Sequence, residues 1–294
     1  MPITAPRDPQ LSAEQQAQLE RWLPDAVVVH DHSWGLVETR VLEVEHGGGR
    51  YIVKAAGPGD GHLRREVEAH QSWLTPWTSV GQAPVLVHHD LGASVIVTQF
   101  LPGTLVLGSL AVHDPEVFRQ AGELLALLHD QPGQIDEGYE ARENEKSLRW
   151  LRQPHRIEGE TVERLRVEIA SWPTPPARLV PTHGDWQPRN WLVHHGEVRI
   201  IDFGRAALRP SMSDLTRLAA QEFRRDPRLE AAFLGGYGSD PRADERGSTH
   251  AWFRTRVREA IGTAAWAHQF GDEAFEAQGQ RMIAEALADP SSSG

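Results

Sequence analysis

The feature that most limits the possible folds of this chain is a change of sequence pattern near residue 101. Before that point, β-branched and alternating apolar residues predict five strands and one helix. The strands are expected over residues 26–31, 37–45, 51–56, 84–90 and 94–100, and the helix over 62–74. Glycine-containing turns at residues 46–50 and 91–93 predict hairpins. Leu101-Pro102-Gly103 then interrupts the pattern.

Helical spacing dominates beyond this break. Asp114-Pro115-Glu116 supplies a helix cap, a proline at the first helical position and an acidic first turn. Short strand signals return at residues 179–182, 191–194 and 198–201, and helices resume from residue 214. We therefore expect an α+β chain with two parts. Residues 1–101 form an antiparallel sheet with one helix, and residues 102–294 form a mainly helical part with a frayed tail at 289–294.

Composition excludes several classes of protein. The 294 residues carry 30 basic and 41 acidic side chains, a formal net charge of −11, which disfavours binding to nucleic acid. Cysteine is absent, so disulfides and thiolate metal sites are excluded. No apolar run is long enough to cross a membrane, and no signal peptide is visible. A cytoplasmic protein, monomeric or dimeric, is the expectation.

Two short motifs carry the strongest chemical signal. HGDWQPRN occupies residues 183–190, and IIDFG occupies residues 200–204. Asp185 and Asn190 are 5 residues apart, and Asp202 lies 17 residues beyond Asp185, directly after an apolar strand. Phosphoryl transfer needs a carboxylate to orient the attacking hydroxyl, and an amide and a second carboxylate to hold Mg²⁺. Each residue alone is a common turn residue, but the joint pattern favours catalysis.

These motifs resemble those of the aminoglycoside phosphotransferase family, a branch of the protein-kinase-like fold that includes choline and other small-molecule kinases. The resemblance extends from about residue 27 to the helix after residue 214. It implies a two-lobed kinase-like fold and a kinase that uses ATP or GTP to phosphorylate a small molecule. It also implies that Asp185 is the catalytic base and that Asn190 and Asp202 are the magnesium ligands.

A kinase-like enzyme also needs a lysine on its third strand and a helical glutamate to orient it. Lys54, one of only two lysines in the chain, ends the expected strand Tyr51-Ile52-Val53-Lys54. Glu66, on the next helix, is the predicted partner, with Glu68 as the alternative on a different helix face. Lys54 at the edge of a sheet and Glu66 on a solvated helix face are the structural alternatives.

The expected nucleotide contacts are weaker signals. The loop that covers the phosphates falls between the first two strands, where Ser33 and Gly35 are the candidates, although a plain turn fits this segment as well. The backbone of Gln99, Phe100 and Leu101 is expected to face the purine.

Three residues are expected to support the site. His183 is expected to bond the backbone near the metal-binding segment. Asp214 either braces the catalytic loop or caps a helix, and His129 is expected to be structural.

The phosphoryl acceptor is the least determined part. Acidic side chains cluster over residues 130–145 and 272–289, and carboxylates lining a cleft would attract a cationic acceptor. This favours an aminoglycoside or a basic cyclic peptide antibiotic, inactivated by phosphorylation. The alternatives are a metabolic kinase acting on choline, a sugar or an amino acid, and a pseudokinase that binds nucleotide without catalysis. Solvated helix surfaces explain most of the individual acids equally well.

Overall fold

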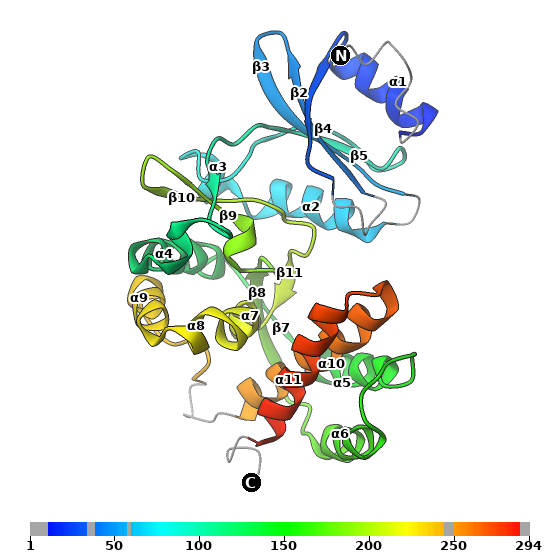
Figure 1. Cartoon of the computed structure of the whole chain (residues 1–294), viewed down its shortest axis with the longest axis vertical. Coiled ribbons are helices and arrows are strands. Elements are labelled where there is room, and N and C mark those ends of the chain that lie inside the picture. Colours follow the sequence, from blue (N-terminus) through cyan, green and yellow to red (C-terminus); the bar gives the residue numbers. More distant parts are fainter. Residues whose placement is uncertain (1–10, 34–38, 58–59, 244–249, 289–294) are drawn as a thin grey trace.

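The computed structural model describes residues 11–33, 39–57, 60–243 and 250–288. Figure 1 shows a strand-rich upper lobe above a mainly helical lower lobe, which confirms the expected α+β, two-lobed architecture. The N-terminal sheet has five antiparallel strands in the order β1-β2-β3-β5-β4. They are β1 Val27–Asp31, β2 Arg40–His46, β3 Gly49–Ala55, β4 Leu86–Asp90 and β5 Val95–Gln99. Both predicted hairpins, β2–β3 and β4–β5, are present.

Three helices accompany this sheet, where the sequence predicted one. The expected helix is α2 (Gly61–Ser72), and a short helix α3 (Thr75–Thr78) follows it. Helix α1 (Ala13–Trp22) was missed because it contains few apolar residues. It begins at a capping box in which Ser12 Oγ accepts from the Gln15 N–H at 3.1 Å and Gln15 Oε1 accepts from the Ser12 N–H at 3.0 Å.

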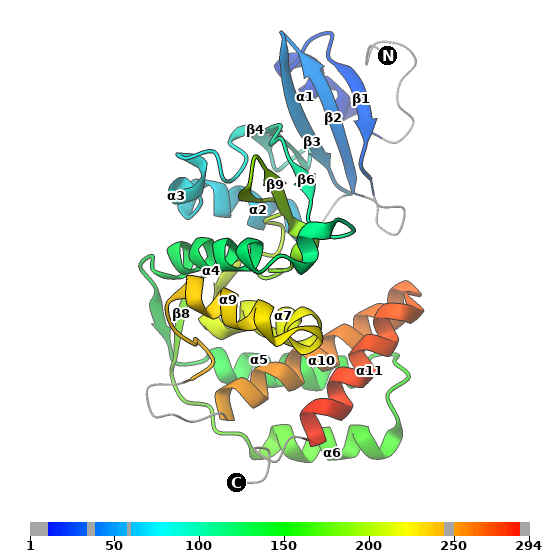
Figure 2. The same cartoon turned by 60° about the vertical axis from the view of Figure 1, so that its left-hand side comes forward.

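The first helix of the lower lobe is the one predicted from its cap. Helix α4 (Pro115–His129) begins where the Asp114 carboxylate accepts a hydrogen bond from the Glu116 N–H at 2.9 Å. It lies side by side with α9 (Pro227–Tyr237) in both views (Figures 1 and 2). A Cβ at Gly122 would lie 2.1 Å from the Phe233 carbonyl oxygen, so glycine permits this close approach of the two helices.

A second group of helices forms the far end of the lower lobe. Its apolar core joins four helices: α5 (Tyr139–Trp150), α6 (Gly159–Ser171), α10 (His250–Phe270) and α11 (Glu273–Ala288). The short helices α7 (Thr216–Ala220) and α8 (Glu222–Arg225) lie between this group and α4.

Two small sheets hold the segments that carry the motifs. One is β10-β9-β6 and the other is β11-β8-β7. Their strands are β6 Thr104–Leu105, β7 Gln134–Asp136, β8 Ala177–Thr182, β9 Trp191–His194, β10 Glu197–Ile200 and β11 Ala207–Arg209. The HGDWQPRN motif connects β8 to β9, and the aspartate of IIDFG follows β10, so both motifs flank the antiparallel β9–β10 hairpin.

The apolar cores do not divide at residue 101. Leu74, Trp77 and Ala83 precede β4 but pack in the main core of the lower lobe, together with Trp186 and Phe203. The backbone continues this connection, because the Ile200 N–H donates to the Gln82 carbonyl at 2.8 Å. The lobes are therefore joined by a shared core as well as by the chain at residues 101–103.

Within the described residues, no helix is both long and apolar enough to cross a membrane.

Candidate active site

The loop after β8 places Asp185 among four donors. Its carboxylate accepts hydrogen bonds from Gln187 Nε2 and Arg189 Nη2, both at 2.6 Å, and from Asn190 Nδ2 at 3.0 Å. Arg217 Nη1, from α7, approaches Asp185 Oδ1 at 2.9 Å. Asp185 is 3% exposed, so these donors replace the water that the buried carboxylate has lost.

The charge of Asp185 is set by these neighbours. Burial opposes ionisation, but Arg217, Arg189 and Arg205 together hold the pKa of the Asp185 carboxyl well below its usual range. Asp185 therefore stays an anion at any ordinary pH. Such a carboxylate can orient a hydroxyl group strongly and can accept its proton as negative charge moves onto the phosphoryl group.

Asp214 braces the catalytic loop from below. Its carboxylate accepts the backbone N–H of His183 at 2.8 Å and that of Gly184 at 2.6 Å, and it contacts His129 Nε2 at 3.1 Å. The N-cap residues of the local helices are Pro210 and Leu215, so the geometry gives Asp214 the bracing role and not the capping role.

The two histidines complete this support. His129 Nδ1 lies 2.8 Å from the Tyr237 hydroxyl, so the ring joins two elements of the lower lobe. His183 Nε2 lies 3.1 Å from the Ile201 carbonyl oxygen, just before Asp202, while its Nδ1 accepts the Asp185 N–H at 3.3 Å. Because Nδ1 accepts, the proton belongs on Nε2, which then donates to Ile201.

Glycine at position 184 has a steric cause. Its φ is +78°, and a Cβ there would lie 2.2 Å from the Arg205 carbonyl oxygen. The loop after Phe203 therefore passes directly over the catalytic loop, and a side chain at position 184 would force the two apart.

Lys54 links the upper lobe to this loop. Its Nζ lies 2.8 and 2.9 Å from the two carboxylate oxygens of Glu66 on α2, and 3.3 Å from Asp202 Oδ1. Lys54 is on β3, an interior strand paired with both β2 and β5, which excludes the edge-strand alternative. Glu66 is 3% exposed whereas Glu68 is exposed, so the predicted partner is the one that makes the contact.

The electrostatics of this ion-paired group agree with its geometry. Burial alone would lower the pKa of the Lys54 ammonium, but the Asp202 and Glu66 carboxylates more than offset this and raise it. Lys54 in turn lowers the pKa of the Asp202 carboxyl. The lysine is therefore a fixed cation that faces the point where the motifs meet.

The residues fit a magnesium site built around bound phosphates. The Asp202 side chain is 53% exposed, with φ +68°, so its carboxylate is accessible from a backbone conformation common at functional sites. Asn190 Nδ2 donates to the Asp185 carbonyl at 2.8 Å, which leaves the Asn190 amide oxygen as the free polar atom. Hard oxygen donors of this kind suit Mg²⁺, which usually takes its remaining ligands from phosphate and water. Within the described residues, no three His, Asp or Glu side chains form a separate metal site.

The expected nucleotide contacts are placed less fully. Ser33 Oγ accepts the Val41 N–H at 3.0 Å, which closes the turn between β1 and β2; phosphate binding by Ser33 stays a prediction. Gly35 lies outside the described residues.

The segment that joins the lobes has two of its three N–H groups in use. Gln99 donates to the Val85 carbonyl at 2.8 Å, and Phe100 donates to the Arg50 carbonyl at 2.9 Å. Across the described part of the chain, the Leu101 N–H has no hydrogen-bond partner. Leu101 is therefore the donor of this segment that is left for a purine.

Sequence reasoning missed the arginines around Asp185. Arg189 lies inside the motif and Arg217 lies three residues after Asp214, one helical turn along the same face, so both positions carried a weak signal. Arg205 and the Arg217 partner Glu259, whose Oε1 lies 3.1 Å from Arg217 Nη2, are brought in by tertiary packing alone.

The structure has clear relatives among solved proteins. Choline kinase LicA from Streptococcus pneumoniae superposes with a TM-score of 0.67 at 18% identity, covering 93% of this chain and 97% of that one. A ternary complex of aminoglycoside phosphotransferase APH(4)-Ia with ADP and hygromycin B gives a TM-score of 0.69 at 12% identity, covering 96% and 100%. Macrolide 2'-phosphotransferase type I gives 0.60 at 17% identity, covering 93% and 98%. At these identities the similarity establishes a kinase-like fold.

Comparison of the sequence itself gives the family. No curated protein matches it significantly. The profile of the phosphotransferase enzyme family, APH, matches residues 32–252, a span that contains Lys54, Glu66, Asp185, Asn190 and Asp202. This span is well over half of the chain, and the chain therefore belongs to the phosphotransferase enzyme family.

Proposed function

We propose that this protein transfers the γ-phosphate of a nucleoside triphosphate to a hydroxyl group of a small molecule. The observation that carries the proposal is the Lys54 ammonium, held between Glu66 and Asp202 where the two motif loops meet. The motif spacing and the family profile support the same reaction.

Each residue has a defined part in this reaction. Lys54 binds the nucleotide phosphates, and Glu66 keeps its ammonium in place. Asn190 and Asp202 hold Mg²⁺, which when bound neutralises the charge of the phosphates. Asp185 orients the acceptor hydroxyl for in-line attack and receives its proton.

The pseudokinase alternative lacks support. Such proteins usually lose one of the residues that bind phosphate or metal, whereas Lys54, Asp185, Asn190 and Asp202 are all present. The Lys54–Glu66 ion pair is also formed, with both N–O distances below 3 Å. Catalysis is therefore the better proposal.

Two acceptor classes remain candidates. A cationic antibiotic, inactivated by phosphorylation, was predicted from the acidic stretches at 130–145 and 272–289. Several of these acids are paired in the structure: Glu140 contacts Arg254 and Arg258, Glu143 contacts Lys146, and Glu285 contacts Arg224. The pairing leaves fewer free carboxylates for a cation and favours the second class, a metabolic alcohol.

The direct test is turnover of Mg-ATP or Mg-GTP with a panel of alcohols, read by product mass. The panel includes aminoglycosides, basic cyclic peptides, choline, sugars and amino alcohols. The expected product gains one phosphoryl group, and Asp185→Asn is expected to lower turnover by about 10²- to 10⁴-fold while nucleotide binding persists. Near-full activity of Asp185→Asn would contradict the proposed role of this carboxylate.

A further inference from the structure

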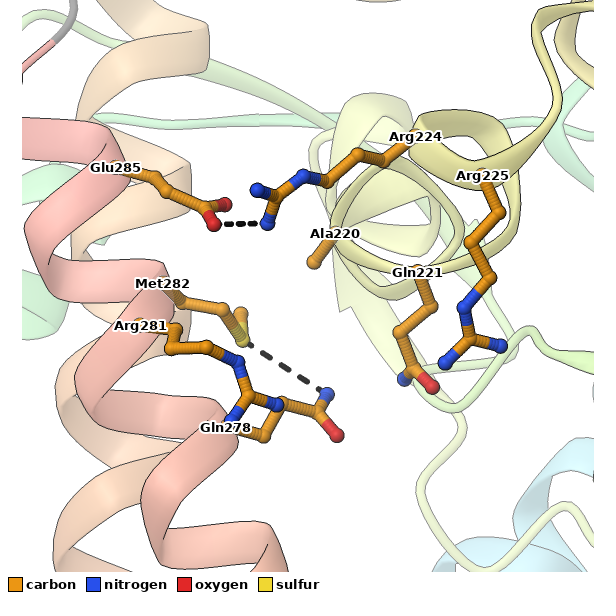
Figure 3. A pocket seen from close by; sticks show the side chains of 8 residues that line it. All are labelled: Ala220, Gln221, Arg224, Arg225, Gln278, Arg281, Met282 and Glu285. Carbon is orange, nitrogen blue, oxygen red and sulfur yellow. Dashed lines mark hydrogen bonds and ion pairs between the residues drawn. The ribbon is translucent and has the colours of Figure 1, made fainter.

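A basic pocket lies in the lower lobe between α7, α8 and α11. The cavity has a volume of about 280 Å³. Figure 3 shows that α8 contributes Arg224 and Arg225 from one side, while α11 contributes Arg281 and Glu285 from the other. The side-chain amides of Gln221 and Gln278 also face the opening, so the lining is rich in hydrogen-bond donors.

The charges of this pocket are not balanced. Glu285 is its only carboxylate, and it is paired with Arg224. Arg225 and Arg281 form no ion pair within the part of the chain that the structure describes, and both are exposed. Two guanidinium groups are therefore free to bind an anion, in a protein whose formal net charge is −11.

The pocket is continuous with the catalytic loop. Arg217 lies one helical turn before the pocket residue Ala220 on α7, and Phe275 lies one turn before Gln278 on α11. The Arg217 guanidinium stands 5.7 Å from the Phe275 ring centroid, so the two helices already meet there. Arg217 also contacts Asp185 at 2.9 Å. One row of residues thus leads from the catalytic carboxylate to the pocket.

The catalytic end of this row is also rich in positive charge. Arg189, Arg205 and Arg217 surround Asp185, and the nearest other acid, Glu259, is paired with Arg217. Arg205 forms no ion pair among the described residues and is partly buried. A cation in this space would face an excess of like charge, whereas an anion would gain charge-assisted hydrogen bonds.

We propose that the arginine groove, formed by Arg217, Arg224, Arg225 and Arg281, binds a carboxylate or phosphate group of the molecule whose hydroxyl is phosphorylated. This rests on the proposed function, because the groove matters to catalysis only if Asp185 is the residue that orients the hydroxyl. The acceptor is then an anionic alcohol, such as a hydroxy acid or a phosphorylated alcohol, and not a cationic antibiotic.

Binding of simple anions tests the groove without requiring the natural acceptor. The protein is saturated with Mg-ADP, so that the nucleotide site is filled, and titrated with malonate, inorganic phosphate or tetramethylammonium by calorimetry. We expect malonate and phosphate to bind and tetramethylammonium not to bind. Arg225→Gln combined with Arg281→Gln is expected to weaken anion binding at least about tenfold, because two charge-assisted contacts are lost.

A matched control separates the groove from general surface charge. Arg142→Gln combined with Arg152→Gln removes two exposed arginines from the region of α5, outside the groove, and is expected to leave anion binding unchanged. Equal anion binding in the groove variant and the wild type, no anion binding at all, or tighter binding of the cation would each overturn the proposal.

A turnover arm identifies the source of the anion. Glycerate and glycerol 3-phosphate are compared with choline and kanamycin as acceptors, with products read by mass. Transfer to glycerate indicates a carboxylate, and transfer to glycerol 3-phosphate indicates a phosphate; transfer only to choline or kanamycin contradicts the groove. Mg-ADP affinity, measured in the same samples, reports on the proposed function separately, since its absence alongside intact anion binding would reject the kinase and not the groove.

Discussion

At the scale of single residues, the site depends on a few positions that tolerate little change. Gly184 is one of them. Its φ of +78° favours glycine, and the Arg205 carbonyl oxygen occupies the place of a Cβ. The conformational and the steric requirement are separate, and mutation can separate them.

Gly184→Ala is expected to destabilise the fold by about 3 kcal/mol or more, since the strain of a positive φ adds to a direct overlap with backbone. Gly196→Ala is the matched control: its φ is +84°, but no atom lies within 4 Å of the position of its Cβ, so only about 1 kcal/mol is expected. Urea unfolding of both variants measures the difference. Equal destabilisation would show that the overlap with Arg205 is relieved without cost.

Glu222 gives a prediction about pH. This side chain is 6% exposed, its Oε2 has no hydrogen-bond partner among the described residues, and burial raises the pKa of its carboxyl from 4.5 to about 7. The folded state therefore keeps the proton that the unfolded state releases above pH 4.5. Stability from this group is complete below pH 4.5 and is lost as pH rises toward about 7.

Glu222→Gln removes this titration. At pH 8 the variant is expected to be more stable than the wild type by about 3 kcal/mol, and near pH 4 the two should be similar. Free energies of unfolding at a series of pH values check this. A constant difference between the two proteins across that range would contradict the assigned pKa.

At the scale of elements, α2 acts through one side chain that reaches the sheet. Glu66 is buried against Lys54, while Glu68 on the same helix is exposed. Glu66→Gln is expected to lower kcat/KM for the nucleotide by about 10- to 100-fold, because the lysine loses its charged partner. Glu68→Gln should leave kinetics unchanged. Steady-state rates with varied Mg-nucleotide measure both, and equal effects would remove Glu66 from the site.

Local patterns explain which elements could be predicted from the sequence. The strands and hairpins of the upper lobe follow alternation and turn residues, and α4 follows its cap and apolar spacing. Helix α1 was missed although Ser12 and Gln15 carry a capping-box spacing, because its buried face is narrow. The choice of Glu66 over Glu68 was correct because the lysine on β3 and the helix after it restrict the geometry.

Contacts between distant elements explain what could not be predicted. Arg217 and Glu259 meet at Asp185 only because α7 and α10 pack beside the catalytic loop. The acidic stretches suggested a cationic acceptor, but no local signal in the sequence shows that Glu140 is taken up by Arg254 and Arg258. Charge patterns along a chain indicate which residues are ionised, whereas pairing depends on the fold.

At the scale of the whole molecule, the two lobes share a core that surrounds Trp77. This residue precedes β4 yet is 1% exposed within the core of the lower lobe. Its Nε1 donates to the Leu124 carbonyl at 3.1 Å, and its ring centroid lies 5.8 Å from Trp186 and 6.0 Å from Phe203. Trp186 follows Asp185 and Phe203 follows Asp202, so the shared core supports both catalytic carboxylates from behind.

Trp77→Ala is therefore expected to weaken the whole molecule and the site together. Loss of this side chain should cost about 3–5 kcal/mol, and turnover should fall because the segments that carry Asp185 and Asp202 lose a common support. Trp22→Ala is the control, since Trp22 stacks on His88 in the upper lobe, 5.1 Å between ring centroids, away from the motifs. It should lower stability less and leave turnover unchanged at a temperature where both variants are folded.

Because the core is shared, the wild-type protein is expected to unfold in one cooperative step. Urea transitions followed by tryptophan fluorescence and by far-ultraviolet circular dichroism should coincide, as every described tryptophan of the main core belongs to the same unit as the helices. Two separate transitions in the wild type would show that the lobes are independent and that Trp77 joins them only weakly. A single transition in the wild type that splits in Trp77→Ala would identify this side chain as the link, because the upper sheet would then unfold without the helices below it.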